Sequence, residues 1–257
     1  MFTNKSTVRT KDDFLSQSVV LDFLQNFDTP NENKKQSLKL RIYKFYGDLK
    51  SMLNVHLIKN YLDADYADEL FDDLKRITYN TDEESMIQIY GKKIRIPREQ
   101  TAYGEPNVMY HFSGISVKAR DWTQNPDLDL NDESEFDEKV KFKLRNVSRI
   151  AGRSACSTFN YALINNYINQ SNNIGYHSDD EKELGRFPVV AGVSLGQERE
   201  ILFKSKLTKE VIRISLPHNS LVIMHYPTNR YWMHSIPKRA QHMGQRISIT
   251  FRGVGHQ

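Results

Sequence analysis

The sequence after Gly152 consists of short apolar segments separated by turn residues. These segments cover residues 158–168, 188–196, 199–205, 211–216, 220–225, 232–237 and 246–252. Short strands at such regular spacing are typical of a sandwich or jelly roll. The chain has 257 residues, which is enough for one large β-rich domain with a sizeable core.

Two helices are predicted before this region. Asp63 is a candidate N-cap for the first helix, and its apolar stripe consists of Leu62, Tyr66, Leu70 and Leu74. The second helix is predicted to open at Ser134-Glu-Phe-Asp137, which resembles a capping box, and its stripe consists of Phe136, Val140, Leu144, Val147 and Ala151. The fold class is therefore mainly β with flanking helices, an α+β arrangement.

The first part of the chain changes character near residue 38. Residues 1–37 are rich in polar side chains and are expected to form a poorly ordered leader, with one apolar segment over 14–27 that suits a short helix. Residues 17–24 resemble a degenerate sliding-clamp-binding box without its final aromatic residue. Residues 38–58 alternate in places, so the sheet is expected to begin there.

A candidate metal site lies at Gly175-Tyr-His177-Ser-Asp179-Asp180-Glu181. In an extended segment the side chains of His177 and Asp179 point to the same side, because side chains alternate with period two. One later histidine would complete a set of two histidines and one carboxylate. This is the ligand set of non-haem Fe(II) oxygenases, and it leaves coordination positions open for a co-substrate and O2.

The last predicted strand carries two arginines on one face. Arg246, Ser248, Thr250 and Arg252 alternate with Ile247, Ile249 and Phe251. If the strand is central, two guanidinium groups point into the interior, where unpaired charges are costly. Since the planar fork of arginine suits carboxylates, a small dicarboxylic acid beside the iron is the expected ligand.

Composition limits the remaining possibilities. A single cysteine, Cys156, excludes an internal disulfide and a cysteine-based zinc site. There is no secretory segment and no apolar run long enough for a membrane span, so an intracellular protein with no membrane contact is expected, nuclear if the source is eukaryotic. The net charge is +4, but residues 201–252 hold one acid against nine bases, which suits a polyanion on one face.

The sequence resembles the AlkB family of Fe(II)- and 2-oxoglutarate-dependent nucleic-acid dealkylases, most closely the animal members that repair duplex DNA. The resemblance covers residues 85–252 and rests on Pro97-Arg-Glu-Gln-Thr-Ala-Tyr103-Gly104, Tyr110-His-Phe112-Ser-Gly114, Leu163-Ile-Asn165-Asn-Tyr167, His177-Ser-Asp179-Asp180-Glu181, Pro227-Thr-Asn-Arg-Tyr-Trp-Met-His234-Ser-Ile-Pro237 and Arg246-x5-Arg252. It implies a double-stranded β-helix (jelly roll) in residues 153–257 and an N-terminal extension with a nucleotide-recognition region in residues 38–152. Residues 38–257 would form one folded unit.

The resemblance also implies roles for individual residues. His177, Asp179 and His234 would hold the iron. Asn165, Tyr167, Arg246, Thr250 and Arg252 would hold 2-oxoglutarate. The substrate-binding residues would be Tyr90, Gly91, Lys92, Tyr110, His111, Phe112, Asp180 and Glu181, with Tyr90 at the position of a phenylalanine that enters the duplex in related animal enzymes.

The activity implied is oxidative DNA dealkylation repair by a dioxygenase. Fe(II), 2-oxoglutarate and O2 would hydroxylate the N-methyl groups of 1-methyladenine and 3-methylcytosine, and formaldehyde would leave. The expected partner is methylated DNA, duplex or single-stranded, with RNA left open, and the expected state is a monomer. Expected phosphate contacts are Lys92, Lys93, Arg95, Arg98, Lys204, Lys206 and Arg230.

Two alternatives remain open at this point. One is another 2-oxoglutarate oxygenase, either an RNA demethylase or a protein hydroxylase built on the same core. The other is a non-catalytic nucleic-acid-binding protein that has kept the scaffold. The intact set of metal-binding residues and both late arginines argue against the second alternative.

Overall fold

The computed structural model describes residues 22–24, 39–46, 48–81, 85–89, 92–112, 114–123 and 132–255. Most of the predicted leader, including residues 17–21 of the clamp-like segment, lies outside these ranges. Within the apolar segment 14–27, β1 (Asp22–Leu24) is a strand that pairs with β2 (Lys39–Tyr46). These three residues are therefore extended, whereas a short helix was predicted for the segment.

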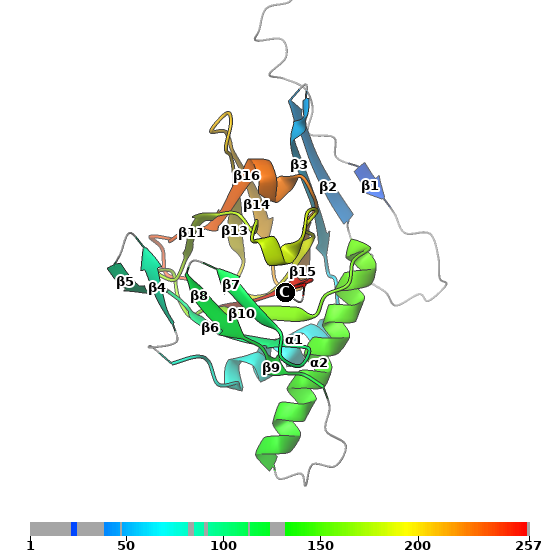
Figure 1. Ribbon diagram of the computed structural model, residues 1–257. Coiled ribbons are helices and arrows are strands. Elements are labelled where there is room, and N and C mark those ends of the chain that lie inside the picture. The colour runs from blue at the N-terminus through cyan, green and yellow to red at the C-terminus, as the bar shows by residue number, and fades with distance from the viewer. Residues whose placement is uncertain are drawn as a thin grey trace, which may run out of the picture.

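A nine-stranded sheet forms the main layer of the protein (Figure 1). Its strand order is β1-β2-β3-β15-β12-β17-β10-β6-β9, with β3 (Asp48–Lys59), β15 (Ser220–Met224), β12 (Val190–Gly196), β17 (Arg246–Arg252), β10 (Tyr161–Tyr167), β6 (Glu99–Gly104) and β9 (Arg120–Asp121). All neighbours are antiparallel except β6 and β9. Because β17 lies between β12 and β10, the strand with the two arginines is central, as the sequence argument required.

A second sheet covers one face of the first. Its order is β11-β16-β13-β14, with β11 (Ile174–His177), β16 (Trp232–Ile236), β13 (Arg199–Ser205) and β14 (Val211–Leu216). A core cluster lies between the two sheets and includes Leu57, Phe203, Val222 and Trp232, all nearly inaccessible to solvent. The two packed sheets form the predicted jelly roll, and strands β13, β14 and β17 have the predicted boundaries.

The other face of the large sheet is covered by two helices, α1 (Ala64–Arg76) and α2 (Asp132–Ala155). The stripes of both helices pack with Ile247, Ile249 and Phe251 of β17 in one core cluster. The apolar and polar side chains of β17 therefore lie on opposite faces of the strand, as predicted. Its apolar side chains face the helices, and its polar side chains face the space between the two sheets.

The helix starts differ in how well the sequence predicted them. Asp63 caps α1 as predicted, because its Oδ1 accepts hydrogen bonds from the backbone N–H groups of Asp65 and Tyr66. The predicted capping box at residues 134–137 is wrong, since α2 already begins at Asp132. Acidic side chains favour the first turn of a helix by themselves, so the run of acids there suits the earlier start.

Two small hairpins and two short helical turns complete the fold. The hairpins are β4 (Met86–Ile89) with β5 (Lys92–Arg95), and β7 (Met109–Phe112) with β8 (Ile115–Lys118). The turns are η2 (Lys182–Leu184) and α3 (Thr228–Tyr231). None of the helices in the described ranges has the length and apolar character needed to cross a membrane.

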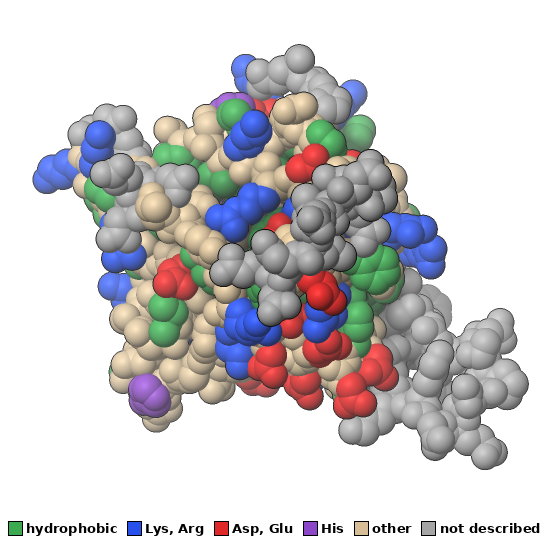
Figure 2. Space-filling view, turned by 90° about the horizontal axis from the view of Figure 1, so that it is seen from below, with side chains coloured by type: hydrophobic (Ala, Val, Ile, Leu, Met, Phe, Trp, Pro, Cys, Tyr) green, Lys and Arg blue, Asp and Glu red, His purple; other side chains and the backbone are tan. Residues whose placement is uncertain are grey.

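Charged side chains gather on part of the face seen in Figure 2. Figure 2 shows acidic groups gathered on one part of this face, with lysines and arginines among them. A separate ion pair is buried between α1 and α2, where Lys143 Nζ lies 2.6 Å from Asp73 Oδ2. This ion pair therefore contributes to the packing of the two helices.

Candidate active site

Two histidines face each other across the smaller sheet. Strands β11 and β16 are antiparallel neighbours, and their register pairs His177 directly with His234. Directly paired residues have side chains on the same face of a sheet. The two imidazole ring centroids consequently lie 4.2 Å apart.

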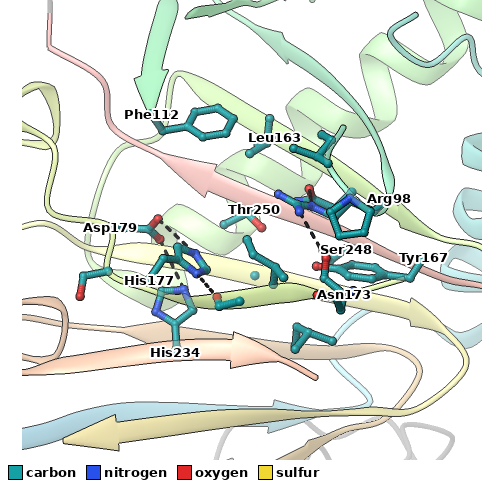
Figure 3. Close-up of a pocket in the computed structure, with 18 of the residues that line it drawn as sticks. Arg98, Phe112, Leu163, Tyr167, Asn173, His177, Asp179, His234, Ser248 and Thr250 are labelled. Carbon is teal, nitrogen blue, oxygen red and sulfur yellow. Dashed lines mark hydrogen bonds and ion pairs between the residues drawn. The ribbon is translucent and has the colours of Figure 1, made fainter. Parts of the chain in front are cut away.

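Asp179 completes the cluster from the loop that follows β11. His177 Nε2 lies 3.9 Å from Asp179 Oδ1, and His234 Nε2 lies 3.9 Å from Asp179 Oδ2. One potential ligand atom from each of the three side chains lies within 4.8 Å of the other two. Figure 3 shows the three side chains converging at one end of a cavity.

The atoms left without partners in this cluster fit a bound cation. His177 Nδ1 donates to the Gly175 carbonyl at 3.0 Å, so Nε2 keeps its lone pair for a ligand. Among the buried atoms of the described residues, Asp179 Oδ2 and His234 Nδ1 have no hydrogen-bond partner. Buried polar atoms are normally satisfied, and an ion at the centre of the cluster would satisfy the carboxylate.

The electrostatics keep these groups in the protonation states that bind metals. Burial lowers the pKa of both imidazoles, and with the neighbouring His177 it brings the pKa of His234 to about 3. Burial alone would raise the pKa of Asp179, but Arg252 and the two histidines outweigh it and hold that pKa below its usual range. Neutral imidazoles and an ionised carboxylate are the forms that coordinate a divalent ion.

A cavity of ≈ 410 Å³ extends from the metal-binding cluster into the space between the sheets. Side chains of β10 and β17 line it, namely Asn165, Tyr167, Arg246, Ser248, Thr250 and Arg252. Figure 3 shows Thr250 between the cluster and the opposite end, where Tyr167, Ser248 and Asn173 lie. The structure thus brings together all the residues predicted for the metal and for the acidic co-substrate.

Arg246 has the properties of an anion-binding group. It is only 3% exposed, its Nη2 donates to Ser194 Oγ at 2.9 Å, and its guanidinium lies 5.1 Å from the ring centroid of Tyr167. Its Nε and Nη1 have no partner among the described residues. Burial lowers the pKa of Arg246, so an anion in the cavity would offset a real desolvation cost.

Arg252 differs because it already has an acidic partner. Its Nη2 donates to Asp179 Oδ1 at 3.0 Å, and both side chains are almost fully buried. Although burial opposes it, the charge of Asp179 raises the pKa of Arg252. Arg252 therefore orients the carboxylate of the metal-binding cluster, while its own Nε and Nη1 have no partner in the described part of the chain.

The predicted substrate-binding residues separate into two groups. Tyr110, Phe112 and Glu181 line the cavity, and the Tyr110 hydroxyl donates to Glu181 Oε2 at 2.5 Å. Burial raises the pKa of the Glu181 carboxyl. These side chains form an aromatic and acidic wall next to the metal-binding cluster.

Asp180, His111 and Lys92 belong to the second group, whose side chains do not line the cavity. Asp180 Oδ2 faces outward and lies 3.4 Å from Lys206 Nζ. His111 Nδ1 contacts Glu183. Lys92 is exposed on β5, while Tyr90 and Gly91, which precede it in the sequence, lie outside the described residues.

Sequence reasoning placed Arg98 wrongly, because it was grouped with surface lysines and arginines as a phosphate contact. The structure buries its side chain in the cavity, where Nε donates to Asn165 Oδ1 at 2.6 Å. Nothing in the local sequence distinguishes Arg98 from the exposed Lys93 and Arg95. Its burial follows from the pairing of β6 with β10, which a single sequence does not reveal.

A jelly roll that holds two histidines and one carboxylate beside a basic cavity defines an Fe(II)- and 2-oxoglutarate-dependent oxygenase. The profile of the 2OG-Fe(II) oxygenase superfamily matches residues 54–252. The bovine protein named DNA oxidative demethylase ALKBH2 (Bos taurus) is 36% identical over 197 residues, which are 73% of this chain and 64% of that protein. The protein of the same name from Mus musculus is 34% identical, and the match covers 81% of this chain and 87% of that protein. The protein from Homo sapiens is also 34% identical, and the match covers 73% of this chain and 69% of that protein.

The chain therefore belongs to the 2OG-Fe(II) oxygenase superfamily and, within it, to the AlkB family that includes the ALKBH2 proteins. Membership confirms the dioxygenase class and its requirement for Fe(II), 2-oxoglutarate and O2.

Proposed function

We propose that this protein repairs DNA by oxidative demethylation of alkylated bases. The observation that carries the proposal is that one cavity holds the His177, Asp179 and His234 cluster together with the buried, partly unpaired guanidinium of Arg246. The similarity to proteins named DNA oxidative demethylase supports DNA as the substrate. The preferred lesions are 1-methyladenine and 3-methylcytosine, with release of formaldehyde.

Each part of the cavity has a separate task in this proposal. His177, Asp179 and His234 hold Fe(II), and Asn165, Tyr167, Arg246, Thr250 and Arg252 hold 2-oxoglutarate. When bound, the iron and the keto acid supply the oxidation of the N-methyl group by O2. Arg246 binds a carboxylate through its free Nε and Nη1 atoms, and Ser194 fixes the orientation of its fork.

The aromatic and acidic wall selects the base. Methylation at N1 of adenine or N3 of cytosine blocks pairing and leaves the base cationic, so the base leaves the stack at a lower cost. A cationic ring gains from the faces of Tyr110 and Phe112. Glu181 lines the cavity and its carboxylate gives a charge-assisted contact, whereas the outward position of Asp180 makes it a less suitable partner.

The surroundings of the cavity suit a nucleic-acid backbone. Lys92, Lys93 and Arg95 lie on the exposed strand β5, next to the cavity-lining residue Ile94. They would neutralise phosphates beside the extracted base, and Tyr90 and Gly91 would contact the gap that the base leaves in the duplex. We further propose a monomer that acts in the nucleus of a eukaryotic cell, with residues 17–24 available for a sliding clamp and residues 38–152 serving nucleotide recognition before the core at 153–257.

The decisive experiment is turnover on a defined lesion. The protein is incubated with Fe(II), 2-oxoglutarate, ascorbate and an oligonucleotide that carries one 1-methyladenine, and mass spectrometry measures the restored adenine and the formaldehyde. His177→Ala should abolish turnover because it removes a metal ligand. His218→Ala is the matched control, since His218 lies outside the cavity and contacts Asp68. If the wild-type protein releases no formaldehyde, or if both variants behave alike, the proposal fails.

Competition between substrates tests the choice of DNA. Equal amounts of duplex DNA, single-stranded DNA and RNA with the same lesion are offered together, and the demethylated fraction of each is measured. DNA of either form should be consumed before RNA. Preferential consumption of the RNA would instead identify an RNA demethylase on the same scaffold.

A further inference from the structure

Arg98 extends from the start of β6 into the cavity, between the substrate wall and the co-substrate end. Its side chain is 8% exposed, and Figure 3 shows it close to Tyr167, Ser248 and Asn173. Nε donates to Asn165 Oδ1 at 2.6 Å, and Nη1 donates to the Asn173 carbonyl at 3.3 Å. The sequence placed Arg98 among the surface cations and predicted neither its burial nor these hydrogen bonds.

The contact with Arg98 fixes the orientation of the Asn165 amide. A guanidinium has only donors, so the atom that faces Arg98 must be the oxygen of Asn165. Gln100 lies opposite Asn165 in the β6–β10 register, and its Nε2 donates to the same oxygen at 3.0 Å. Both lone pairs of Oδ1 are therefore used, and Asn165 can serve the cavity only through its Nδ2 donors.

This orientation matters for an acidic ligand. A dicarboxylic acid offers acceptors to its binding site, so it gains a hydrogen bond from Nδ2 and would be repelled by an amide oxygen. An amide that is free to rotate would present the oxygen part of the time. Arg98 removes that alternative before the ligand binds, which is the usual benefit of preorganisation.

Arg98 also contributes charge and anchoring. Its described hydrogen bonds reach only amide and carbonyl oxygens, and in the described part of the chain it forms no ion pair with an acid. Burial lowers the pKa of Arg98, so a nearby dianion would offset the cost of burying its charge. The preceding carbonyl, that of Pro97, accepts from Asn173 N at 3.1 Å and Asn172 Nδ2 at 3.0 Å, which holds this segment against the loop that leads to β11.

We propose that Arg98 is a positioning residue for the co-substrate: it locks the Asn165 amide with its N–H groups toward the acid and adds uncompensated positive charge to the cavity. This inference rests on the proposed function, because it assumes that the acid in the cavity is 2-oxoglutarate. It assigns Arg98 to the co-substrate, and the phosphate role expected from the sequence is withdrawn.

The test measures binding and needs no turnover. The Mn(II)-loaded protein is titrated calorimetrically with N-oxalylglycine, an unreactive analogue of 2-oxoglutarate, in the absence of DNA. Arg98→Met should weaken binding about tenfold or more, because it removes a hydrogen bond to a charged donor and one positive charge. Arg98→Lys should recover part of the affinity, since an ammonium can still donate to Asn165 Oδ1.

Two further variants control the experiment. Arg213→Met removes an exposed arginine of β14 that lies outside the cavity and should leave the affinity within about twofold. Asn165→Asp has nearly the same shape and forms an ion pair with Arg98, so the protein should fold, but a carboxylate oxygen then faces the acid. This variant should lose analogue binding almost completely while it keeps its affinity for Mn(II).

The outcomes separate the two proposals. If the wild-type protein does not bind the analogue, the proposed function itself fails. If the wild-type protein binds it and Arg98→Met binds it equally well, or Asn165→Asp binds it as tightly as the wild type, the positioning role is overturned while the proposed function stands.

Discussion

The ion pair between Asp179 and Arg252 makes a metal-binding residue part of the stability of the fold. The two side chains are 2% and 5% exposed, and Arg252 Nη2 lies 3.0 Å from Asp179 Oδ1. Removing one partner of such a pair leaves the other charge buried without compensation. We therefore predict that Asp179→Ala lowers the free energy of unfolding of the metal-free protein by ~3–5 kcal/mol.

The double variant provides the sharper test. Asp179→Ala with Arg252→Met removes both charges, so no unpaired charge remains, and the loss should be only ~0–2 kcal/mol. Arg252→Met alone should cost about as much as Asp179→Ala alone, ~3–5 kcal/mol. The two single changes are thus strongly non-additive, as expected for groups in direct contact.

Urea denaturation in the presence of EDTA measures these free energies, and the slope of each transition checks that unfolding remains two-state. A thermal scan should show each single variant melting roughly 6–20 °C lower, at about 2–4 °C per kcal/mol for a chain of this size. Asp180→Ala is the matched control. Its carboxylate is exposed and, among the described residues, pairs only with Lys206 at 3.4 Å, so the loss should stay below ~1 kcal/mol.

Two results would refute the reasoning. One is a loss for Asp179→Ala that is no larger than the loss for Asp180→Ala. The other is a double variant whose loss equals the sum of the two single losses. Either result would mean that the pair is well solvated in spite of its burial.

Three further predictions concern other parts of the structure. Arg199→Met should lower the free energy of unfolding by ~2–4 kcal/mol in urea titrations, because the buried guanidinium donates to three backbone carbonyls; a loss below ~1 kcal/mol would contradict this. The metal-free protein should lose stability as the pH falls below 6.5, and His234 alone should account for a loss of ~2 kcal/mol at pH 5. The reason is that the imidazole of His234 binds a proton at this pH in the unfolded protein, whereas in the folded protein it does so only near its pKa of about 3. Melting measured at several pH values in EDTA should show a smaller pH dependence in His234→Ala. Glu181→Gln should raise KM about tenfold for an oligonucleotide with cationic 1-methyladenine and much less for one with uncharged 1-methylguanine, and equal effects on both would exclude a charge-based contact.

The strand pattern of the core was predictable because burial imposes a period of two. In β17 the alternation of Ile247, Ile249 and Phe251 with polar residues predicted the strand and its two faces, whereas its central position in the sheet came only from the structure. The pairing of His177 with His234 could not be predicted from spacing, since it depends on the register of β11 against β16. Only the resemblance to a known family selected His234 from the eight histidines of the chain.

The two acidic residues after the metal-binding aspartate were predicted with only partial success. Asp180 and Glu181 were both predicted to contact the substrate, and the structure places only Glu181 on the cavity wall. Both residues lie in the loop after β11, where side chains do not alternate with a fixed period, so their spacing did not distinguish them. The position of Arg98 has no comparable local signal, because burial of its side chain depends on Asn165 of β10 and on the Asn173 loop.

The charges that line the cavity set requirements for both ligands. Arg95, Arg98, Arg246 and Arg252 contribute four positive charges and Fe(II) would add two, whereas Asp179 and Glu181 are the carboxylates that face them. A dianion such as 2-oxoglutarate offsets part of this excess, so binding of the acid should lower the electrostatic cost of admitting a cationic base. The base should therefore lie beside Glu181, whose carboxylate offsets the charge of Arg252, because the Arg252 guanidinium lies only 4.9 Å from the Tyr110 ring centroid. The co-substrate should therefore bind before the methylated base. A substitution of Arg98 that weakens co-substrate binding should also weaken the binding of a cationic base more than the binding of a neutral base.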